Sequence, residues 1–332
     1  MYKGSVRLNY IGIDVSKAKL DCLWLKDPEK NKVKTKSIDN KAEGHQELYD
    51  WLLKQTGSEA QEIMVTLEAT GIYHETLAYT LFQKGFQVAV VNPARPKEFA
   101  KSLGSQHKND KKDSFILALY GYRMRPELWQ PEAPEIRELK ALSARLEALE
   151  NDLQREENRY EKAEFNASSE VVMASLNTMI KSIKDEKERL EKEINDHIDR
   201  HPYLKKDRQL LESIPGVGPV ISRLMLSVIH SRGFTKASQV AAYLGLIPIQ
   251  NESGVFRGRS RLSKSGPAKI RGKLYMAAVV AGRWNLDIQL QQERLLQQGK
   301  HKMAALCAAM RKLVHICFGV IKHQTKYQPQ AM

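Results

Sequence analysis

A heptad-spaced run of leucines in the middle of the chain constrains the fold more than any other feature. The run consists of Leu139, Leu142, Leu146, Leu149 and Leu153, at intervals of three and four residues. This spacing is typical of a coiled-coil seam. After a polar break at residues 166–169, apolar residues continue at helical spacing from Leu176 to Ile198. The pattern predicts two long amphipathic helices joined by a turn, which form either an intermolecular coil or an ordinary helical bundle.

The regions on either side of these helices differ in their periodicity. Before them, strand signals at 8–15, 20–25, 33–38, 62–67 and 88–91 alternate with helix signals at 45–55 and 73–84 and a last helix near 110. The order β-β-β-α-β-α-β-α predicts a mixed sheet flanked by helices. After them, the chain is mainly helical, and its tail from Gln324 onward is expected to fray. We therefore predict three domains, at residues 1–128, 129–203 and 204–332.

Composition excludes several classes of protein. The three cysteines form no CxxC pair and the nine histidines form no metal-binding spacing; this argues against a disulfide framework and against zinc. No apolar run approaches the length of a membrane span, and the chain opens with no signal segment. We expect a cytoplasmic protein, associated with the nucleoid if it binds DNA, that has no membrane partner.

The positive charge is concentrated in particular regions of the chain. The formal net charge is +14, yet residues 132–200 carry 18 acidic and 12 basic residues. The positive excess therefore lies outside the heptad region. Residues 251–275 carry seven Lys or Arg and a single acid, Glu252. A concentrated basic segment of this kind favours a polyanionic partner such as nucleic acid.

Four acidic residues form the first candidate site. Asp14 lies inside an apolar strand pattern, where an unpaired carboxylate is costly. Glu68 ends another strand pattern, and Asp110 and Asp113 share one face of a helix start. Carboxylates suit Mg²⁺, and paired ions act on phosphodiesters. The alternative for Asp110 and Asp113 is a solvated charge run, because Lys108, Lys111 and Lys112 surround them.

The second candidate site is the basic segment and the glycine turn that precedes it. The residues predicted to contact nucleic acid are Arg257, Arg259, Arg261, Lys264, Lys269, Arg271, Lys273, Gly216 and Gly218. The turn at 214–218 suits either a helix-hairpin-helix that binds phosphate or a plain helix connection. Pro219 removes one N–H from such a phosphate site. The segment also carries Ser253, Ser260, Ser263 and Ser265, any of which is a weak nucleophile unless it is activated.

These motifs, taken in order, resemble a known family. The matching stretches are residues 10–17 (YIGIDVSK), 67–71 (LEATG), 91–93 (VNP), 109–113 (NDKKD), 212–218 (ESIPGVG), 242–248 (AYLGLIP) and 252–254 (ESG), with Arg257-Gly258 and Ser263-Lys264. They resemble the DEDD-type transposases of bacterial insertion sequences, the IS110 family, which is related to the Piv DNA invertases. The resemblance covers nearly the whole chain.

The resemblance implies a fold, a metal site and a nucleophile. It implies an α/β RuvC-like fold of the RNase H type, a coiled-coil arm and a mainly α C-terminal transposase domain. Asp14, Glu68, Asp110 and Asp113 would bind Mg²⁺, and Ser253 would attack DNA to form a covalent serine–DNA intermediate. The family also implies donor and target DNA, a structured bridge RNA as guide, and a homo-oligomer, either a dimer or a tetramer. Ser260, Ser263 and Ser265 would then contact phosphate or form turns.

Two other functions fit parts of the pattern. A RuvC-like Holliday-junction endonuclease would use the acids and water and need no serine. A non-catalytic nucleic-acid-binding protein would use the basic surface alone. The four acids argue against the second alternative, because a simple binder gains nothing from carboxylates that face phosphate.

Overall fold

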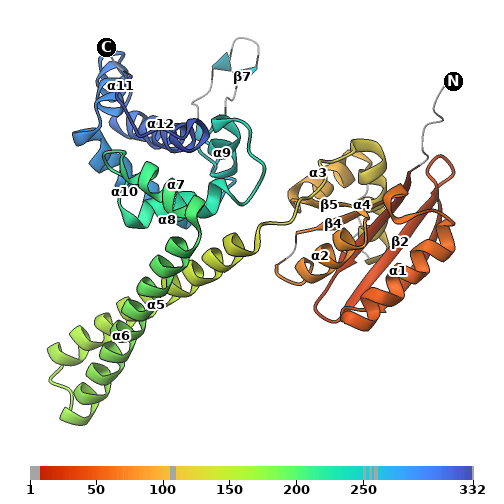
Figure 1. Ribbon diagram of the computed structural model, residues 1–332, viewed down its shortest axis with the longest axis horizontal. Helices are drawn as coiled ribbons and strands as arrows, with labels where there is room; N and C mark the ends of the chain where they lie inside the picture. Colours follow the sequence, from red (N-terminus) through yellow and green to blue (C-terminus); the bar gives the residue numbers. More distant parts are fainter. Residues whose placement is uncertain are drawn as a thin grey trace. The chain divides into compact units, whose positions relative to one another are not determined.

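The chain divides into two compact units, Met1–Pro131 and Glu132–Met332 (Figure 1). A computed structural model describes residues 8–69, 71–104, 110–249, 252–253, 256–257 and 261–330, with the side chains of 110–112, 252, 256 and 257 outside the description. The first unit is a mixed α/β sheet domain and the second is mainly helical, as the periodicity predicts.

A five-stranded sheet forms the centre of the first unit. Its strands are β1 (Asn9–Val15), β2 (Lys19–Asp27), β3 (Lys32–Asp39), β4 (Ile63–Glu68) and β5 (Gln87–Val91), in the spatial order β3-β2-β1-β4-β5. The first three pair antiparallel, whereas β4 pairs parallel with both β1 and β5. The helical connections between β3, β4 and β5 make this parallel pairing possible. The carboxyl ends of β1 and β4 therefore lie at the same edge of the sheet.

Helices cover both faces of this sheet. One face packs Ile11 and Ile13 against Leu48 of α1 (Ala42–Thr56) and Leu77 of α2 (Glu75–Gln83). The opposite face packs Tyr10, Leu23 and Met64 against α4 (Asp110–Met124). The short helices η1 (Ala60–Glu62) and α3 (Ala94–Ser102) complete the unit. Successive side chains of each strand point to opposite faces of the sheet and therefore pack into two different hydrophobic cores.

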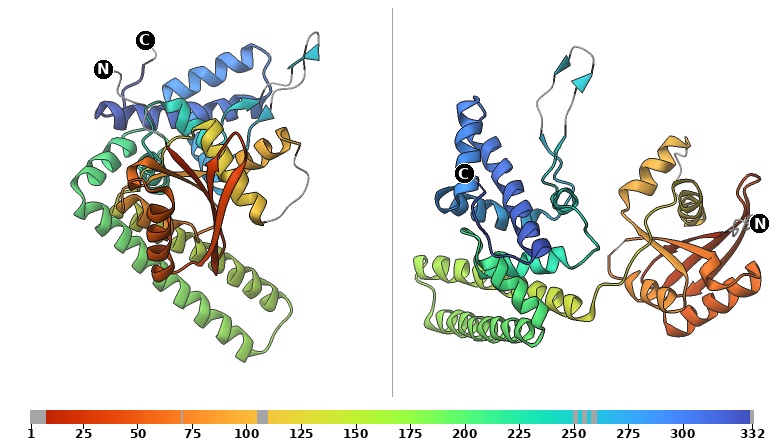
Figure 2. Two further views of the ribbon diagram at one scale, coloured as in Figure 1. Left: turned by 90° about the vertical axis from the view of Figure 1, so that its right-hand side faces the viewer. Right: turned by 45° about the horizontal axis from the view of Figure 1, so that its top comes forward.

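The second unit begins with the helical arm that the heptads predict. Its helices α5 (Pro134–Phe165) and α6 (Glu170–Arg200) lie side by side along their length, as Figure 2 shows. The base of the arm shares one hydrophobic core with the helices that follow. Those helices are α7 (Pro202–Glu212), α8 (Pro219–Ile229), α9 (Ala237–Tyr243), α10 (Ala268–Trp284), α11 (Leu286–Gln297) and α12 (Lys302–His323). The arm base and the C-terminal helices thus form one compact unit.

Short strands build a hairpin on this helical unit. Strand β6 (Pro248–Ile249) pairs antiparallel with β9 (Arg261–Leu262), and β7 (Glu252–Ser253) pairs with β8 (Phe256–Arg257). The two pairings are nested, so β6 and β9 form the base and β7 and β8 lie further out. In Figure 1, β7 stands away from the helices of the unit. The predicted basic loop is therefore a β-hairpin along part of its length.

Two predictions are wrong for the C-terminal region: that the tail from Gln324 onward frays, and that no apolar run approaches the length of a membrane span. The tail does not fray between Gln324 and Gln330, because Tyr327 Oη lies 2.7 Å from Asp287 Oδ2 and its backbone N–H donates to Ser213 Oγ at 2.9 Å. Helix α12 does have the length and apolar composition of a membrane span. Half of that segment is buried, with Leu313 and Cys317 in the core of the second unit. Packing against the other helices therefore accounts for its apolar composition.

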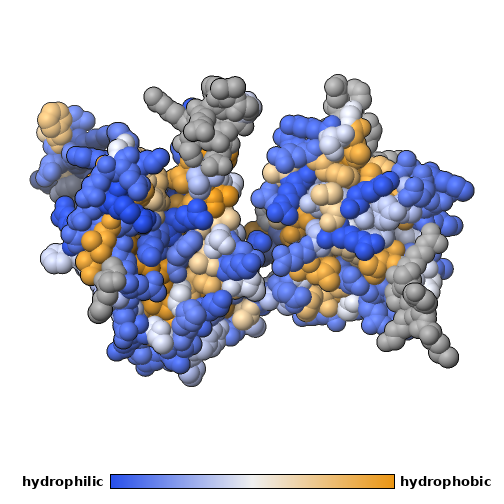
Figure 3. Space-filling view, turned by 90° about the horizontal axis from the view of Figure 1, so that it is seen from above, coloured by the Kyte–Doolittle hydropathy of each residue, from blue (hydrophilic) through white to orange (hydrophobic). Residues whose placement is uncertain are grey.

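The surface agrees with a chain that is rich in charge. Figure 3 shows polar residues over most of the visible face of both units, with smaller apolar patches between them. Among the described residues, large apolar side chains are most exposed at the far end of the arm, where Phe165 is 91% and Val171 is 80% exposed.

Candidate active site

Asp14 and Glu68 lie on neighbouring strands and point to the same face of the sheet. The parallel register joins Ile13 to Leu67, so Asp14 and Glu68 are the next residues along β1 and β4. Paired residues on adjacent strands share a face, and the strands lie about 4.8 Å apart. Two carboxylates therefore emerge together at the carboxyl ends of β1 and β4.

Gly12 determines how closely helix α4 approaches this face. A Cβ atom on Gly12 would lie 2.0 Å from the carbonyl oxygen of Ser114 and 2.4 Å from the amide nitrogen of Ala118. Only glycine allows the helix backbone to lie directly on β1 here. The glycine two residues before Asp14 thus has a packing role that the sequence pattern did not reveal.

The direction of α4 brings Asp113 toward the two strand carboxylates. Ser114 lies over Gly12, while Gly121 further along the helix lies over Thr66 and Tyr10. The helix therefore runs antiparallel to β1, and the residues before Ser114 lie toward the Asp14 end of the strand. Asp113 is half-buried at this end. Asp110 opens the same helix, but its side chain lies outside the described residues.

The donor chemistry of these acids suits a hard cation. Asp14, Glu68 and Asp113 offer only carboxylate oxygens, the ligands that Mg²⁺ prefers in combination with water. Among the described side chains, however, no group of three His, Cys, Asp or Glu is already arranged around a common point. The fold thus places the carboxylates at one edge of the sheet without assembling a finished coordination shell from the described side chains.

Asp21 is an acidic neighbour that sequence reasoning missed. The antiparallel register pairs Asp14 with Asp21 of β2, so both side chains lie on the α4 face. Lys19 Nζ lies 2.8 Å from Asp21 Oδ2 and offsets its charge. The signal was available, because a short turn at 16–18 between two strands brings Asp21 opposite Asp14. This part of the sheet edge is therefore more acidic than the predicted residues alone suggest.

Ser253 belongs to the second unit and is exposed on β7. It pairs with Phe256 of β8, so only residues 254 and 255 separate the two paired positions. An exposed hydroxyl on a hairpin is accessible to a large substrate such as DNA. Ser263 and Ser265, in contrast, hydrogen-bond to each other, with 2.6 Å between their Oγ atoms. Their hydroxyls stabilise the turn that follows β9; Ser260 lies outside the described residues.

The basic residues predicted to contact nucleic acid differ in whether their side chains already form ion pairs within the protein. Arg261 and Lys264 are exposed near the base of the hairpin. Lys269 and Lys273 form ion pairs of 3.0 Å and 3.7 Å with Glu147 and Glu150 of α5. Exposed pairs of this kind are weak, and a phosphate can replace the carboxylate. Arg259 and the side chain of Arg257 lie outside the described residues.

Arg271 has a structural role in the described fold. Its Nη1 donates to the backbone oxygens of Gly266 at 2.6 Å and Leu244 at 3.3 Å. These bonds tie the start of α10 to the end of α9. The guanidinium is therefore partly occupied by the protein itself, which the basic spacing alone did not indicate.

The turn between α7 and α8 has a packing role at its first glycine. Gly216 has a φ of 97°, and a Cβ there would lie 2.6 Å from Ala281 Cβ on α10. Gly218 is exposed at the N-cap of α8, with no atom close to the position of an added Cβ. Near this helix start, Glu212 Oε1 accepts a hydrogen bond from Ser222 Oγ at 2.9 Å. A carboxylate thus lies close to the first turn of α8, where its negative charge disfavours a bound phosphate.

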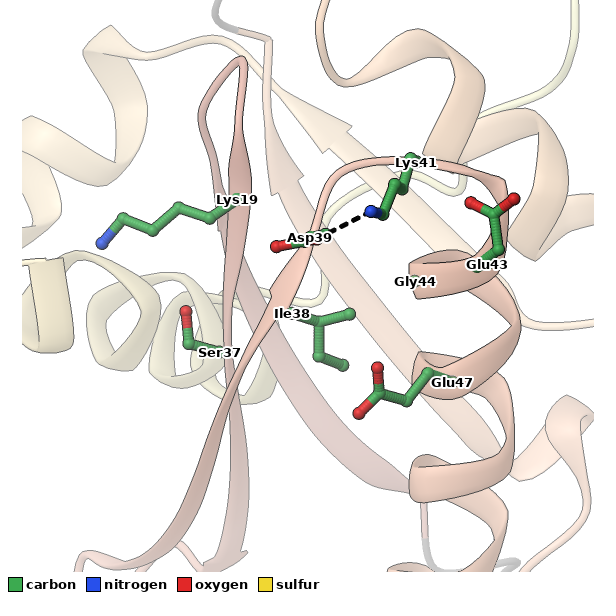
Figure 4. Close-up of a pocket in the computed structure, with 8 residues that line it drawn as sticks. All are labelled: Lys19, Ser37, Ile38, Asp39, Lys41, Glu43, Gly44 and Glu47. Atoms are coloured by element: carbon green, nitrogen blue, oxygen red, sulfur yellow. Dashed lines mark ion pairs between the residues drawn. The ribbon is translucent and has the colours of Figure 1, made fainter.

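A shallow pocket lies between β3 and α1 in the first unit (Figure 4). Figure 4 shows Lys41 pointing toward Asp39, and their Nζ and Oδ2 atoms are 3.0 Å apart. Glu43 and Glu47 of α1 and Lys19 of β2 also line it. This mixture of charges favours neither an anion nor a cation, so we assign it no ligand.

Known proteins resemble the chain over nearly its full length. Residues 11–163 match a family of DEDD type described as "Transposase", and residues 208–292 match "Transposase IS116/IS110/IS902 family". The Pilin gene-inverting proteins of Moraxella bovis and Moraxella lacunata are each 31% identical over 322 residues, which cover 96% of this chain and 97% of the relative. An insertion element IS110 protein of Streptomyces coelicolor is 23% identical over 160 residues, which cover 48% of this chain and 38% of that protein.

Proposed function

The chain belongs to the IS116/IS110/IS902 family of transposases, and we infer that it acts on DNA as a recombinase. We propose that it cleaves and rejoins DNA with the carboxylates of the first unit together with Ser253. The observation that carries this proposal is that Asp14 and Glu68 are neighbours at the carboxyl ends of β1 and β4, with the Asp113 end of α4 directed toward them. We further propose that the first unit is a RuvC-like domain of the RNase H type. Its strand order and mixed pairing support this.

The acidic residues would hold Mg²⁺ at the scissile phosphate. Asp14, Glu68 and Asp113 would supply carboxylate oxygens, and Asp110 opens the same helix. Bound Mg²⁺ would polarise the phosphate and neutralise charge that develops during displacement. The residues of the chain would hold the phosphate in a fixed orientation, which lowers the entropic cost of the reaction.

Ser253 would provide the nucleophile. Its Oγ would form a bond to phosphorus as one P–O bond of the DNA strand breaks, the serine proton would be lost, and the released strand oxygen would take up a proton. The new serine–DNA ester conserves the energy of the phosphodiester, so the reverse attack by a strand end rejoins DNA without ATP. The exposed position of Ser253 on β7 supports this role.

The basic residues would hold nucleic-acid backbones. Arg261 and Lys264 are exposed, and Lys269 can exchange its carboxylate partner for a phosphate. Phosphate contacts position a nucleic acid but do not read its sequence. We propose that a structured guide RNA selects donor and target DNA by base pairing, while these cations bind backbone.

The arm would join copies of the chain into a dimer or tetramer. In its far half, the seam residues Leu176, Ile180 and Ile183 are only half-buried by the single partner helix α5. A two-helix hairpin leaves such a seam open, and a second copy could cover it.

Polar substitutions in this far seam are expected to reduce self-association. We expect Leu176→Asn combined with Ile180→Asn to shift the protein to a smaller species in sedimentation velocity, because each change adds an unpaired amide to an apolar contact. Thr178→Asn, on the exposed side of the same helix, is the matched control and should leave the mass unchanged. An unaltered mass in the double variant would place the contact elsewhere.

The test of the proposed function is the detection of a covalent protein–DNA adduct. Purified protein would be incubated with labelled donor and target DNA, RNA transcribed from the element, and Mg²⁺. We expect a protease-sensitive adduct on a denaturing gel, and its loss when EDTA removes the metal. Cleaved strands without an adduct would instead favour the junction endonuclease. Nucleic-acid binding that is equally strong with and without Mg²⁺, with no cleavage, would favour a non-catalytic nucleic-acid-binding protein.

A further inference from the structure

Asn40 connects the two loops that follow the strand carboxylates. It lies between β3 and α1, and its Nδ2 donates to the carbonyl oxygen of Ser16 at 2.9 Å and to that of Tyr73 at 3.1 Å. Ser16 is two residues beyond Asp14, and Tyr73 is five residues beyond Glu68. One amide group thus spans the segments in which both carboxylate-bearing strands leave the sheet.

The orientation of the Asn40 amide is fixed by His45. The Nε2 atom of His45 lies 2.9 Å from Asn40 Oδ1, and His45 is only 3% exposed. Burial lowers the pKa of His45. Because an amide oxygen can only accept a hydrogen bond, Nε2–H of His45 is the donor to Asn40 Oδ1. With its oxygen held in this way, the NH₂ group must face the two carbonyls. Both of its hydrogens are then used.

The loop after β1 is itself a well-defined turn. The Ser16 backbone N–H donates to the Lys19 oxygen at 2.9 Å, and Lys19 N–H donates to Ser16 Oγ at 3.1 Å. The backbone N–H of Asn40 also donates to the Ala18 oxygen at 2.9 Å. Asn40 therefore holds a rigid turn through both its backbone and its side chain, and its second hydrogen bond transfers this constraint to the loop after β4.

We propose that Asn40 is a positioning residue that sets the separation of the Asp14 and Glu68 carboxylates for divalent-metal binding. This inference rests on the proposed function, because it assumes that these carboxylates bind the metal. Mg²⁺ and Mn²⁺ require ligands at closely defined positions, and the described carboxylates are not already assembled around one point. Residues that orient ligands from outside the coordination shell typically change metal affinity by about 10–100-fold.

The test measures metal binding and loop exchange in the full-length protein without DNA. Asn40→Ala removes all three side-chain hydrogen bonds. Both variants keep the backbone bond to Ala18; Asn40→Ser is the milder of the two, because its hydroxyl is a donor that is too short to reach both carbonyls. Asn177→Ala, on the exposed side of helix α6, is the matched control, because alanine is readily accommodated in a helix. Mn²⁺ affinity would be followed by electron paramagnetic resonance, and backbone amide hydrogen exchange would be followed in metal-free protein.

We expect Asn40→Ala to weaken Mn²⁺ binding by about tenfold or more, with Asn40→Ser intermediate and Asn177→Ala unchanged. Amides in the 16–19 and 71–75 segments should exchange faster in both Asn40 variants, even without metal. If wild-type protein binds Mn²⁺ and both Asn40 variants bind it equally well, the positioning role is wrong, whatever happens to thermal stability. If wild-type protein binds no Mn²⁺, the proposed function itself is wrong and the inference is lost with it.

Discussion

Asp14→Asn is expected to reduce DNA cleavage and adduct formation by at least about 1,000-fold, corresponding to roughly 4 kcal/mol of lost transition-state stabilisation. Asparagine keeps the shape of the side chain but removes a charged oxygen ligand. Asp14 also lies beside Glu68 and opposite Asp21, so removal of one negative charge lowers the repulsion among them. The metal-free protein should therefore remain folded and melt at an equal or higher temperature.

The measurements are the yield of cleaved and adduct DNA on a denaturing gel and the thermal midpoint without metal. Asp50→Asn provides a matched control, because Asp50 is exposed on α1 and accepts a hydrogen bond from Gln46 that asparagine can also accept. Activity close to wild type in Asp14→Asn would show that the strand carboxylates do not hold the catalytic metal. A large loss of thermal stability would show instead that Asp14 has a structural role.

Ser253→Ala is expected to abolish the covalent adduct completely while leaving metal binding intact. The side chain is exposed on β7, so loss of its Oγ removes a nucleophile without creating a cavity. The Mn²⁺ affinity of the protein should be unchanged, because the carboxylates proposed to bind the metal belong to the other compact unit. The readout is the adduct band, compared at equal protein concentration with wild type.

The control for this variant is Ser263→Ala, which removes another serine hydroxyl near the same hairpin. Ser263 Oγ bonds to Ser265 Oγ and accepts from the Ser265 backbone N–H, so a modest effect on the turn is expected but the adduct should persist. An adduct that survives in Ser253→Ala would assign the nucleophile to another residue. Free cleaved strands from both wild type and variant, without an adduct, would indicate hydrolysis by water.

Local periodicity was enough to predict most of the elements. The five strands of the first unit, the helices α1, α2 and α4, and the two helices of the arm agree with the structure because spacings of two and of three to four residues report directly on which face is buried. Helix α3, between β5 and α4, was not predicted. The C-terminal tail could not be predicted in the same way. Its order depends on Tyr327 reaching Asp287, which lies 40 residues earlier in the chain.

The candidate site residues also divide into those whose role the sequence pattern indicated and those whose role it did not. Asp14 was identifiable because an acid inside an apolar strand pattern requires an explanation. The roles of Gly216 and Arg271 were not, because each depends on a contact with another helix or turn: Gly216 with Ala281, and Arg271 with Leu244 and Gly266. Composition and spacing describe such residues only as candidates for phosphate contact.

The sequence by itself determined the succession of strands and helices, the arm and the identity of the acidic and basic residues, because these depend on near neighbours in the chain. Only the tertiary structure decided that Glu68 lies beside Asp14, that α4 runs back along β1 toward the Asp14 end, and that Asn40 joins two loops. These arrangements depend on strand register and helix direction. Both are set by packing between segments far apart in the chain, which no local pattern records.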